Sequence, residues 1–343
     1  MKRDYSTLKT LGWQPYFAQQ VSEEERTEMP PVRVTEVHRS SLRVIGDDLD
    51  TTIPPNQNVT VGDWLLLDVA LPQSSRLLER KSLIKRRAPG TDRQVQLIAA
   101  NIDTVFIVTS CNPEFSVARL ERYIALTLDA DITPVIILTK ADLCSDVDHY
   151  VAAARTISEQ VPVVTIDARG NEPNEKLAEW CKQGKTVAVL GSSGVGKSTL
   201  ANALAGNQLI ETKAIREDDA KGRHTTTRRQ MHFIPGGCVI LDTPGMRELQ
   251  LTDATSGIGS VFSDLRDLAT QCRFRNCQHL SEPGCAVTDA VKNGTIDEAR
   301  LGRWRKLIDE DVYNTTNQFE RKTKEKAQAK TTGVSQKYNK KRS

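Results

Sequence analysis

The chain has 343 residues, a formal net charge of +3 and 38% hydrophobic residues. This length predicts two or three domains, and the low apolar content favours polar loops and ends around them. No apolar run is long enough for a membrane span and the first residues lack the apolar segment of a signal peptide, so we expect a cytoplasmic protein without membrane contact. The odd number of cysteines, seven, argues against a disulfide framework.

Short strands are predicted in the N-terminal third of the chain. Residues 32–37, 41–45 and 63–69 have strand character and are separated by glycine, proline and aspartate turn signals. This spacing is typical of a small barrel, and an oligonucleotide-binding (OB) barrel is the leading candidate. Residues 76–93 then carry seven basic and two acidic residues. They are expected either to follow a nucleic-acid backbone or to form a solvated polar strand and loop.

A candidate guanine-binding loop follows a buried-strand pattern at residues 134–138. It consists of Thr139, Lys140, Ala141 and Asp142. Ligands of open α/β sheets bind at the carboxyl ends of strands, where Asp142 can accept hydrogen bonds from guanine N1–H and the exocyclic amine. Adenine cannot supply that pair of donors. The same residues are also typical of an ordinary helix N-terminus. A further strand at 163–166 leads to a weaker candidate for a base-side loop at 167–169.

A complete phosphate-binding loop comes later in the chain, with the pattern G-x-x-x-x-G-K-S. It consists of Gly191, Ser192, Ser193, Gly194, Val195, Gly196, Lys197 and Ser198. A strand is predicted before it at 186–190, and a helix after it at 199–205 that ends at Gly206. Strand, loop and helix together are the context that identifies this motif. We expect Lys197 to neutralise β- and γ-phosphate charge and Ser198 to bind Mg²⁺.

Two further nucleotide elements follow the phosphate loop. Residues 239–241 predict a strand that ends at Asp242, which is expected to hold Mg²⁺ through water. Gly245 leaves room for its N–H to approach the γ-phosphate. The segment 222–227, GRHTTT, supplies a threonine for the Mg²⁺ shell; Thr226 is our candidate, and Thr225 and Thr227 remain alternatives. The base-reading loop comes last in ordinary small GTPases, whereas here it comes first.

Four candidate metal ligands are clustered in the C-terminal part of the chain. They follow the pattern C-x4-C-x-H-x5-C and are Cys272, Cys277, His279 and Cys285. Three thiolates and one imidazole are a typical ligand set for a closed, tetrahedral, structural Zn²⁺. The alternative is that these cysteines lie in a loop by chance.

A helix and a basic tail are predicted at the C-terminal end. Residues 296–308 have helical spacing, with Leu301, Trp304 and Ile308 on one packing face. The segment 321–343 has nine basic residues and one acidic residue. We expect this segment to be disordered and attracted to phosphate backbones, and a merely solubilising tail is the alternative.

The order of these elements, together with the segment 94–103, resembles the RsgA family of circularly permuted GTPases, which act in small ribosomal subunit biogenesis. The resemblance covers residues 32–310. It implies a multi-domain α/β protein with an OB-type barrel at 32–93, a circularly permuted P-loop GTPase domain at 94–260 and a mainly helical zinc-binding domain at 261–320. An N-terminal extension (1–31) and the basic tail (321–343) flank these domains.

The resemblance also implies hydrolysis of GTP to GDP and phosphate, stimulated by the small (30S) ribosomal subunit, and contact with its 16S rRNA during late maturation. It implies Mg²⁺ bound with GTP and one structural Zn²⁺, and we expect a monomer. GTP-binding positions carry over onto the loop from Thr139 to Asp142 and onto Gly191 to Thr199. The family's zinc ligands carry over onto Cys272, Cys277, His279 and Cys285.

Two positions raise questions about binding and chemistry. The family usually has asparagine where this chain has Thr139, and a threonine hydroxyl cannot both contact guanine and tie the base loop to the phosphate loop. We therefore expect weaker nucleotide affinity, with guanine preference kept through Asp142. Met246 stands where Ras-like enzymes have the glutamine that orients water. We hypothesise that His224 takes part in hydrolysis instead, and that His224 and Lys197 are the catalytic residues.

Two other classes of protein remain open. One is a different P-loop enzyme, such as an ATP-dependent kinase, which base selectivity would distinguish. The other is a non-catalytic RNA-binding assembly protein that uses nucleotide only as a conformational switch. Turnover measured with and without small subunits would distinguish it.

Overall fold

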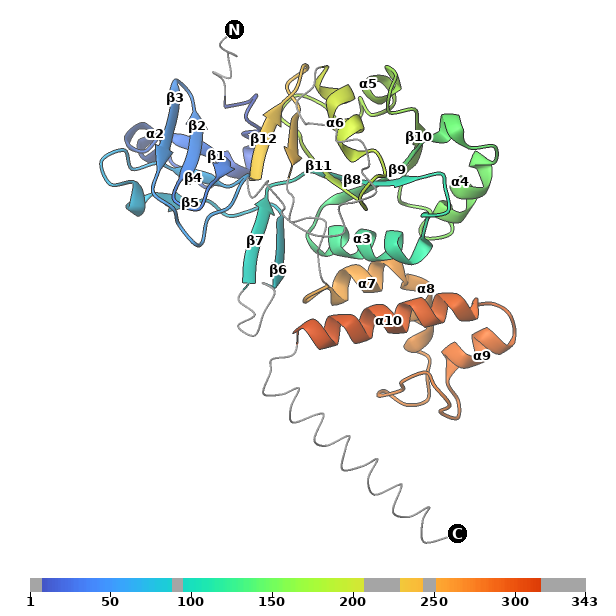
Figure 1. The fold of residues 1–343 in the computed structure, drawn as a ribbon. Coiled ribbons are helices and arrows are strands. Elements are labelled where there is room, and N and C mark those ends of the chain that lie inside the picture. Colours follow the sequence, from blue (N-terminus) through green and yellow to red (C-terminus); the bar gives the residue numbers. More distant parts are fainter. Residues whose placement is uncertain (1–7, 88–94, 207–228, 243–250, 316–343) are drawn as a thin grey trace. The chain divides into compact units, whose positions relative to one another are not determined.

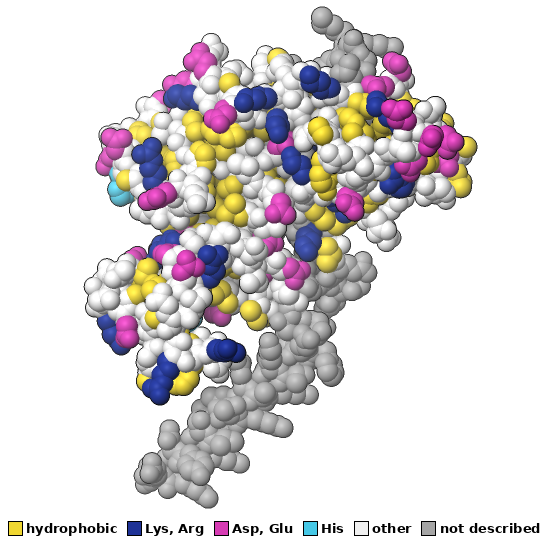
Figure 2. Space-filling view, turned by 180° about the vertical axis from the view of Figure 1, so that it is seen from behind, with side chains coloured by type: hydrophobic (Ala, Val, Ile, Leu, Met, Phe, Trp, Pro, Cys, Tyr) yellow, Lys and Arg dark blue, Asp and Glu magenta, His cyan; other side chains and the backbone are white. Residues whose placement is uncertain are grey.

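The computed structural model of the chain describes residues 8–87, 95–206, 229–242 and 251–315. The chain forms two compact units, Met1–Leu249 and Gln250–Ser343. Within the described residues, no helix has the length and apolar character needed to cross a membrane. On the face that Figure 2 shows, Lys and Arg side chains are interspersed with Asp and Glu side chains among the coloured residues. The coloured residues of that face therefore do not form one continuous basic patch.

One sheet of 11 strands runs through the first unit, and the strands at one end of it, from the edge strand β10 to β13, are parallel. The parallel strands lie in the order β10 (Val163–Ile166), β9 (Thr133–Thr139), β8 (Thr104–Ser110), β11 (Thr186–Leu190) and β13 (Val239–Asp242). β12 (Arg229–Phe233) continues the sheet and is antiparallel to β13. All residues of β8 are buried, as expected for a strand covered on both faces by helices.

Helices cover both faces of this parallel part (Figure 1), with α3 (Val117–Asp129) on one face and α5 (Glu172–Lys176) and α6 (Lys197–Ala205) on the other. α4 (Val147–Arg155) packs near β9 and β10. Between sheet and helices, Phe106, Val187, Leu200 and Ile240 belong to one buried apolar cluster. The predicted strands at 134–138, 163–166, 186–190 and 239–241 are confirmed as β9, β10, β11 and β13.

The N-terminal third is made of antiparallel strands. It contains β1 (Pro31–Val37), β2 (Leu42–Gly46), β3 (Leu49–Ile53), β4 (Trp64–Leu66), the short 3-10 turn η1 (Pro72–Ser74), β5 (Arg76–Leu77), and a separate hairpin of β6 (Leu83–Arg87) and β7 (Val95–Ala100). The three predicted strands of this region are confirmed, although the third is shorter than expected. Its core contains Val34, Val44 and Leu65. The OB assignment remains a prediction.

The segment before β1 packs against these strands. It contains α1 (Pro15–Ala18) and α2 (Glu23–Glu28), and a capping box between Ser22 and Glu25 begins α2. Leu11 and Phe17 are buried in one cluster with Trp64 of β4.

A strand pairing and a buried arginine are among the contacts that join the antiparallel and parallel parts. β1 pairs with β12, Glu36 opposite Gln230. The Arg33 side chain of β1 is 1% exposed and donates hydrogen bonds to Thr186 Oγ1 (2.9 Å) and to the Asn101 carbonyl (3.2 Å). Burial lowers the pKa of this guanidinium to about 10, against the opposing effect of nearby carboxylates. Its donors are nevertheless satisfied, as a buried charge requires.

The second unit is helical in its described part, with α7 (Thr255–Val261), α8 (Ser263–Ala269), α9 (Ala286–Lys292) and α10 (Glu298–Thr315). The predicted helix at 296–308 is thus part of α10, which extends further. Its predicted stripe is partly wrong: Leu301, Trp304 and Leu307 are buried, whereas Ile308 is 36% exposed. The buried face follows a spacing of three or four residues and continues through Asp311, which accepts a hydrogen bond from Ala254 N and so holds the start of α7.

Candidate nucleotide and metal sites

The ends of four parallel strands lie at one edge of the sheet. Thr139 at the end of β9 is the register partner of both Ser110 of β8 and Ile166 of β10. Leu190, at the end of β11, is the partner of Ile107 of β8. The order of the chain reverses between β8 and β11, which is the position where open α/β sheets bind ligands. The candidate base loop and the phosphate loop both emerge at this edge.

The phosphate loop adopts a conformation that requires its glycines. Gly194 and Gly196 have positive φ angles of 77° and 95°, a region that L side chains rarely adopt. At Gly191, a Cβ atom would lie 2.2 Å from the Val108 carbonyl oxygen, so a side chain cannot fit. α6 begins at Lys197, two residues before the predicted start at 199, because the end of the loop is already its first turn. The helix ends at Gly206 in left-handed conformation, as predicted.

Thr139 joins the base loop to the phosphate loop. It is 1% exposed, and its hydroxyl donates a hydrogen bond to the Val195 carbonyl at 2.6 Å, with the Thr109 carbonyl 3.1 Å away. The shorter threonine therefore makes the inter-loop tie. The hydroxyl proton is thus used within the protein, and the expected loss of a contact to guanine stays a prediction.

The other residues of the base loop follow directly. Lys140 has a left-handed backbone, φ 57°, and turns the chain into the short 3-10 helix η2 (Ala141–Leu143). Asp142 lies in that helix and is exposed. The weaker base-side candidate at 167–169 follows β10 and so lies beside this loop in the sheet. There Asp167 Oδ1 accepts a hydrogen bond from Arg169 N at 2.9 Å.

The remaining nucleotide candidates are only partly described. Asp242 ends β13, whose Leu241 is the partner of Ala188 in β11, so its backbone lies at the same edge. His224, Thr226, Gly245 and Met246 lie outside the described residues.

One basic side chain at the phosphate loop had not been predicted. Arg119 of α3 donates a hydrogen bond from Nη1 to Ser192 Oγ at 2.8 Å. Lys197 Nζ in turn donates to the Ser192 carbonyl. No sequence pattern indicates the first contact, since Arg119 and Ser192 are brought together only by the packing of α3 beside the sheet.

The four predicted metal ligands lie together in the second unit, and all their candidate ligand atoms are within 4.8 Å of one another. Cys272 Sγ is 3.9 Å from Cys285 Sγ, and each of these sulfurs is 3.5 Å from His279 Nδ1. Tetrahedral zinc, with Zn–S of about 2.3 Å and Zn–N of about 2.0–2.1 Å, gives S–S and S–N separations of about 3.8 and 3.6 Å. The cluster could therefore hold a metal ion.

The protein around the cluster shifts the pKa values of two of its thiols in opposite directions: burial raises the pKa of the Cys277 thiol to about 11, whereas that of Cys285 is lowered. Cys285 caps α9, and its sulfur accepts a hydrogen bond from Thr288 N at 3.4 Å. Burial raises the pKa of the Cys285 thiol, but the hydrogen bonds from Thr288 outweigh it and the pKa falls to about 6. The centre of the His279 ring lies 5.4 Å from that of the Trp304 ring of α10, so the long helix packs against the loop that carries the cluster.

The basic segment at 76–93 is partly neutralised within the fold. Arg76 pairs with Glu25 at 3.1 Å, Arg80 with Asp63 at 2.7 Å and Lys81 with Asp103 at 2.8 Å. Three of the seven basic residues of this segment are thus paired with carboxylates of the same chain, and whether the segment follows a nucleic-acid backbone or is a solvated polar strand and loop stays a prediction.

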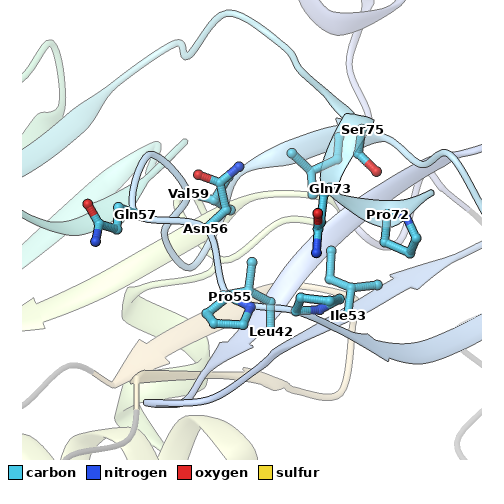
Figure 3. Close-up of a pocket in the computed structure, with 11 residues that line it drawn as sticks. Leu42, Ile53, Pro55, Asn56, Gln57, Val59, Pro72, Gln73 and Ser75 are labelled. Carbon is cyan, nitrogen blue, oxygen red and sulfur yellow. The ribbon is translucent and has the colours of Figure 1, made fainter.

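A pocket of about 300 Å³ opens in the antiparallel region (Figure 3). Leu42, Ile53 and Val59 form apolar walls, and Asn56 and Gln73 provide amide groups. Among the described residues that line it, none carries a charge. This pocket is therefore unsuited to a triphosphate, and it lies apart from the carboxyl edge of the parallel sheet.

These features define a circularly permuted GTPase: the base-side strands β9 and β10 precede the phosphate-loop strand β11 in the chain, and β8 separates them from β11 in the same sheet. A sequence model of the RsgA GTPase family matches residues 77–252. A model of the ABC transporter family matches residues 175–336, a range that contains the phosphate loop.

Curated relatives and solved structures agree with this class. The chain is 46% identical over 313 residues to small ribosomal subunit biogenesis GTPase RsgA 2 of Vibrio parahaemolyticus, covering 90% of this chain and 86% of that protein. It is 47% identical over 317 residues to the RsgA protein of Mesorhizobium japonicum, covering 90% and 91%. The crystal structure of YjeQ from Thermotoga maritima superposes with a TM-score of 0.58 at 27% identity, covering 81% of this chain and 96% of that one.

A second solved structure shares the fold. It is YloQ, described as a circularly permuted GTPase, with a TM-score of 0.57 at 23% identity and coverage of 87% of this chain and 100% of that one. The chain belongs to the RsgA GTPase family, and it is an enzyme that hydrolyses GTP.

Proposed function

We propose that this protein binds the small (30S) ribosomal subunit and its 16S rRNA, acts in late maturation of that subunit and hydrolyses GTP with ribosome-stimulated turnover. The observation that carries the proposal is the convergence of the base loop and the phosphate loop at one sheet edge in permuted order. The relatives named small ribosomal subunit biogenesis GTPases support the choice of partner.

In this proposal, GTP lies along the carboxyl edge of the parallel strands. Asp142 accepts hydrogen bonds from guanine, and Lys140 lies over the base. The loop from Gly191 to Thr199 surrounds the phosphates, with Lys197 on the β- and γ-phosphates and Ser198 on Mg²⁺. Thr226 and Asp242 complete the Mg²⁺ shell, Gly245 contacts the γ-phosphate, and His224 serves hydrolysis.

The remaining domains contact RNA in this proposal. An OB-type barrel at 32–93 and a zinc-binding domain at 261–320 flank the GTPase domain at 94–260, and the basic tail at 321–343 approaches phosphate backbones. The distances of 3.5–3.9 Å among Cys272, His279 and Cys285 support one structural Zn²⁺ as the metal. We propose a cytoplasmic monomer with an N-terminal extension at 1–31.

Stimulation by small subunits tests the proposed partner. We expect purified small ribosomal subunits to raise the GTP turnover number by at least about tenfold. A general acid or base typically contributes roughly 10²–10⁴-fold, so a group that is supplied or ordered on docking is sufficient for this increase. Phosphate release is measured with small subunits, with large subunits and without ribosomal particles.

The same assay distinguishes the alternatives. His224→Ala is expected to lose the stimulation while keeping GTP affinity. Stimulation that survives His224→Ala contradicts that role, and equal turnover with large and small subunits contradicts the proposed partner. Nucleotide binding without turnover under every condition would favour a non-catalytic switch.

Base selectivity tests Asp142. We expect the wild-type protein to bind GTP more tightly than ATP, and Asp142→Asn to weaken GTP binding at least about tenfold, since two hydrogen bonds to a charged acceptor are lost. An asparagine amide can donate to the C2 carbonyl of xanthine, so the variant should gain affinity for xanthosine triphosphate. Fluorescent-nucleotide titration measures all three affinities.

Asp146→Asn is the matched control, because Asp146 is an exposed N-cap of α4 and asparagine also caps helices well. Equal affinities of the wild type for GTP and ATP would contradict the guanine assignment.

A further inference from the structure

We propose that Arg119 is a positioning residue for GTP binding: it holds Ser192, and through Ser192 it orients the phosphate-loop lysine Lys197. The inference rests on the proposed function, in which the loop from Gly191 to Thr199 binds the triphosphate. Neither the sequence motif nor the family's GTP-binding positions include Arg119.

The geometry forms a relay of three residues. Arg119 Nη1 donates to Ser192 Oγ at 2.8 Å. The carbonyl of the same serine accepts a hydrogen bond from Lys197 Nζ. Ser192 thus accepts a hydrogen bond from α3 through its side chain and one from Lys197 through its main-chain carbonyl.

Arg119 is itself held in place by the start of its helix. Ser116 caps α3 and its hydroxyl accepts a hydrogen bond from Arg119 N at 3.4 Å. Arg119 Nη1 also donates to the Glu114 carbonyl at 3.4 Å. The guanidinium therefore lies between the loop after β8 and the phosphate loop, and its position is fixed by residues outside the phosphate loop.

Loss of the Arg119 contact is expected to weaken the binding of GTP more than that of GDP. The phosphate-loop lysine reaches the β- and γ-phosphates, so a misplaced Lys197 loses more interaction with a triphosphate than with a diphosphate. Arg119 is exposed, so water screens the contact and the effect is limited to that of about one hydrogen bond.

The test measures GTP and GDP dissociation constants of the full chain by fluorescent-nucleotide titration. Arg119→Ala is expected to weaken GTP binding about fivefold and GDP binding less than about twofold, which corresponds to about 1 kcal/mol and below 0.5 kcal/mol. Arg119→Lys, which keeps the charge and one donor, should recover at least half of the loss. Arg155→Ala on α4 is the matched control, because it removes one exposed arginine at the end of a different helix.

A double-mutant cycle separates the relay from simple charge. Ser192→Ala should weaken GTP binding to a similar extent, and Arg119→Ala combined with Ser192→Ala should be no weaker than either single variant. Additive losses, or an Arg119→Ala affinity equal to that of Arg155→Ala, would overturn the inference. If thermal unfolding shows that Arg119→Ala is not folded, the GTP affinities of Arg119→Lys and Ser192→Ala still test the inference. A wild-type protein that does not bind GTP would instead overturn the proposed function.

Discussion

Replacing Lys197 with alanine is expected to raise the dissociation constant for GTP by at least about 30-fold, the lower end of the roughly 2–5 kcal/mol that a lost partner of a charged, hydrogen-bonded pair costs. The ammonium group lies at the start of α6, where loop N–H groups and the helix dipole already favour anions. Without it, β- and γ-phosphate charge is left without its cation. Isothermal titration with GTP in the presence of Mg²⁺ measures the change.

Lys182→Ala provides the control, since Lys182 is an exposed lysine before β11 and its removal changes the net charge equally. Thermal unfolding without nucleotide should be similar for both variants. If Lys197→Ala bound GTP as tightly as Lys182→Ala, the phosphate-loop assignment would be wrong.

Loss of the metal is expected to unfold the described part of the second unit, residues 251–315. Cys285 is buried, caps α9 and provides one of the four clustered ligand atoms. Structural Zn²⁺ contributes about 10–16 kcal/mol of apparent binding free energy in zinc-finger peptides, and a whole domain is stable by only about 5–15 kcal/mol. Cys285→Ser should therefore lower the zinc content well below one ion per chain and abolish amide-exchange protection in α9.

The first unit gives an internal reference in the same experiment. Since the proposed nucleotide residues precede Gln250, amide protection in α6 and GTP affinity should persist in Cys285→Ser. Cys144→Ser, outside the cluster, should keep its zinc. Unchanged protection in α9 after complete removal of zinc by a chelator would contradict a structural role for the metal.

The elements best predicted from the sequence are those whose signals are local. The strand at 186–190 and the C-terminal glycine of α6 were predicted correctly, because a β-branched apolar run and a left-handed glycine each depend on a few neighbouring residues. The metal cluster was predictable for a similar reason, since its ligands lie close together in the chain.

Contacts between distant segments were not predictable. No pattern indicates that β12 pairs with β1, that Arg33 reaches Thr186, or that Arg119 reaches Ser192. Each contact depends on tertiary packing across a large sequence separation. The burial of α10 was predicted only in part, because Leu307 and Ile308 are adjacent on the helix and periodicity does not decide which one faces inward.

The position of β12 has a consequence for how this protein can be divided. β12 has a strand on each side, β13 on one and β1 on the other. A fragment that begins after the antiparallel region would leave the Arg229 and Gln230 backbone as an open sheet edge. It would also remove the Arg33 guanidinium, which binds Thr186 at the start of the phosphate-loop strand β11. Open edges of this kind promote self-association. The nucleotide-binding half is therefore not a detachable module, and any shortened version that keeps its sheet intact must also keep β1.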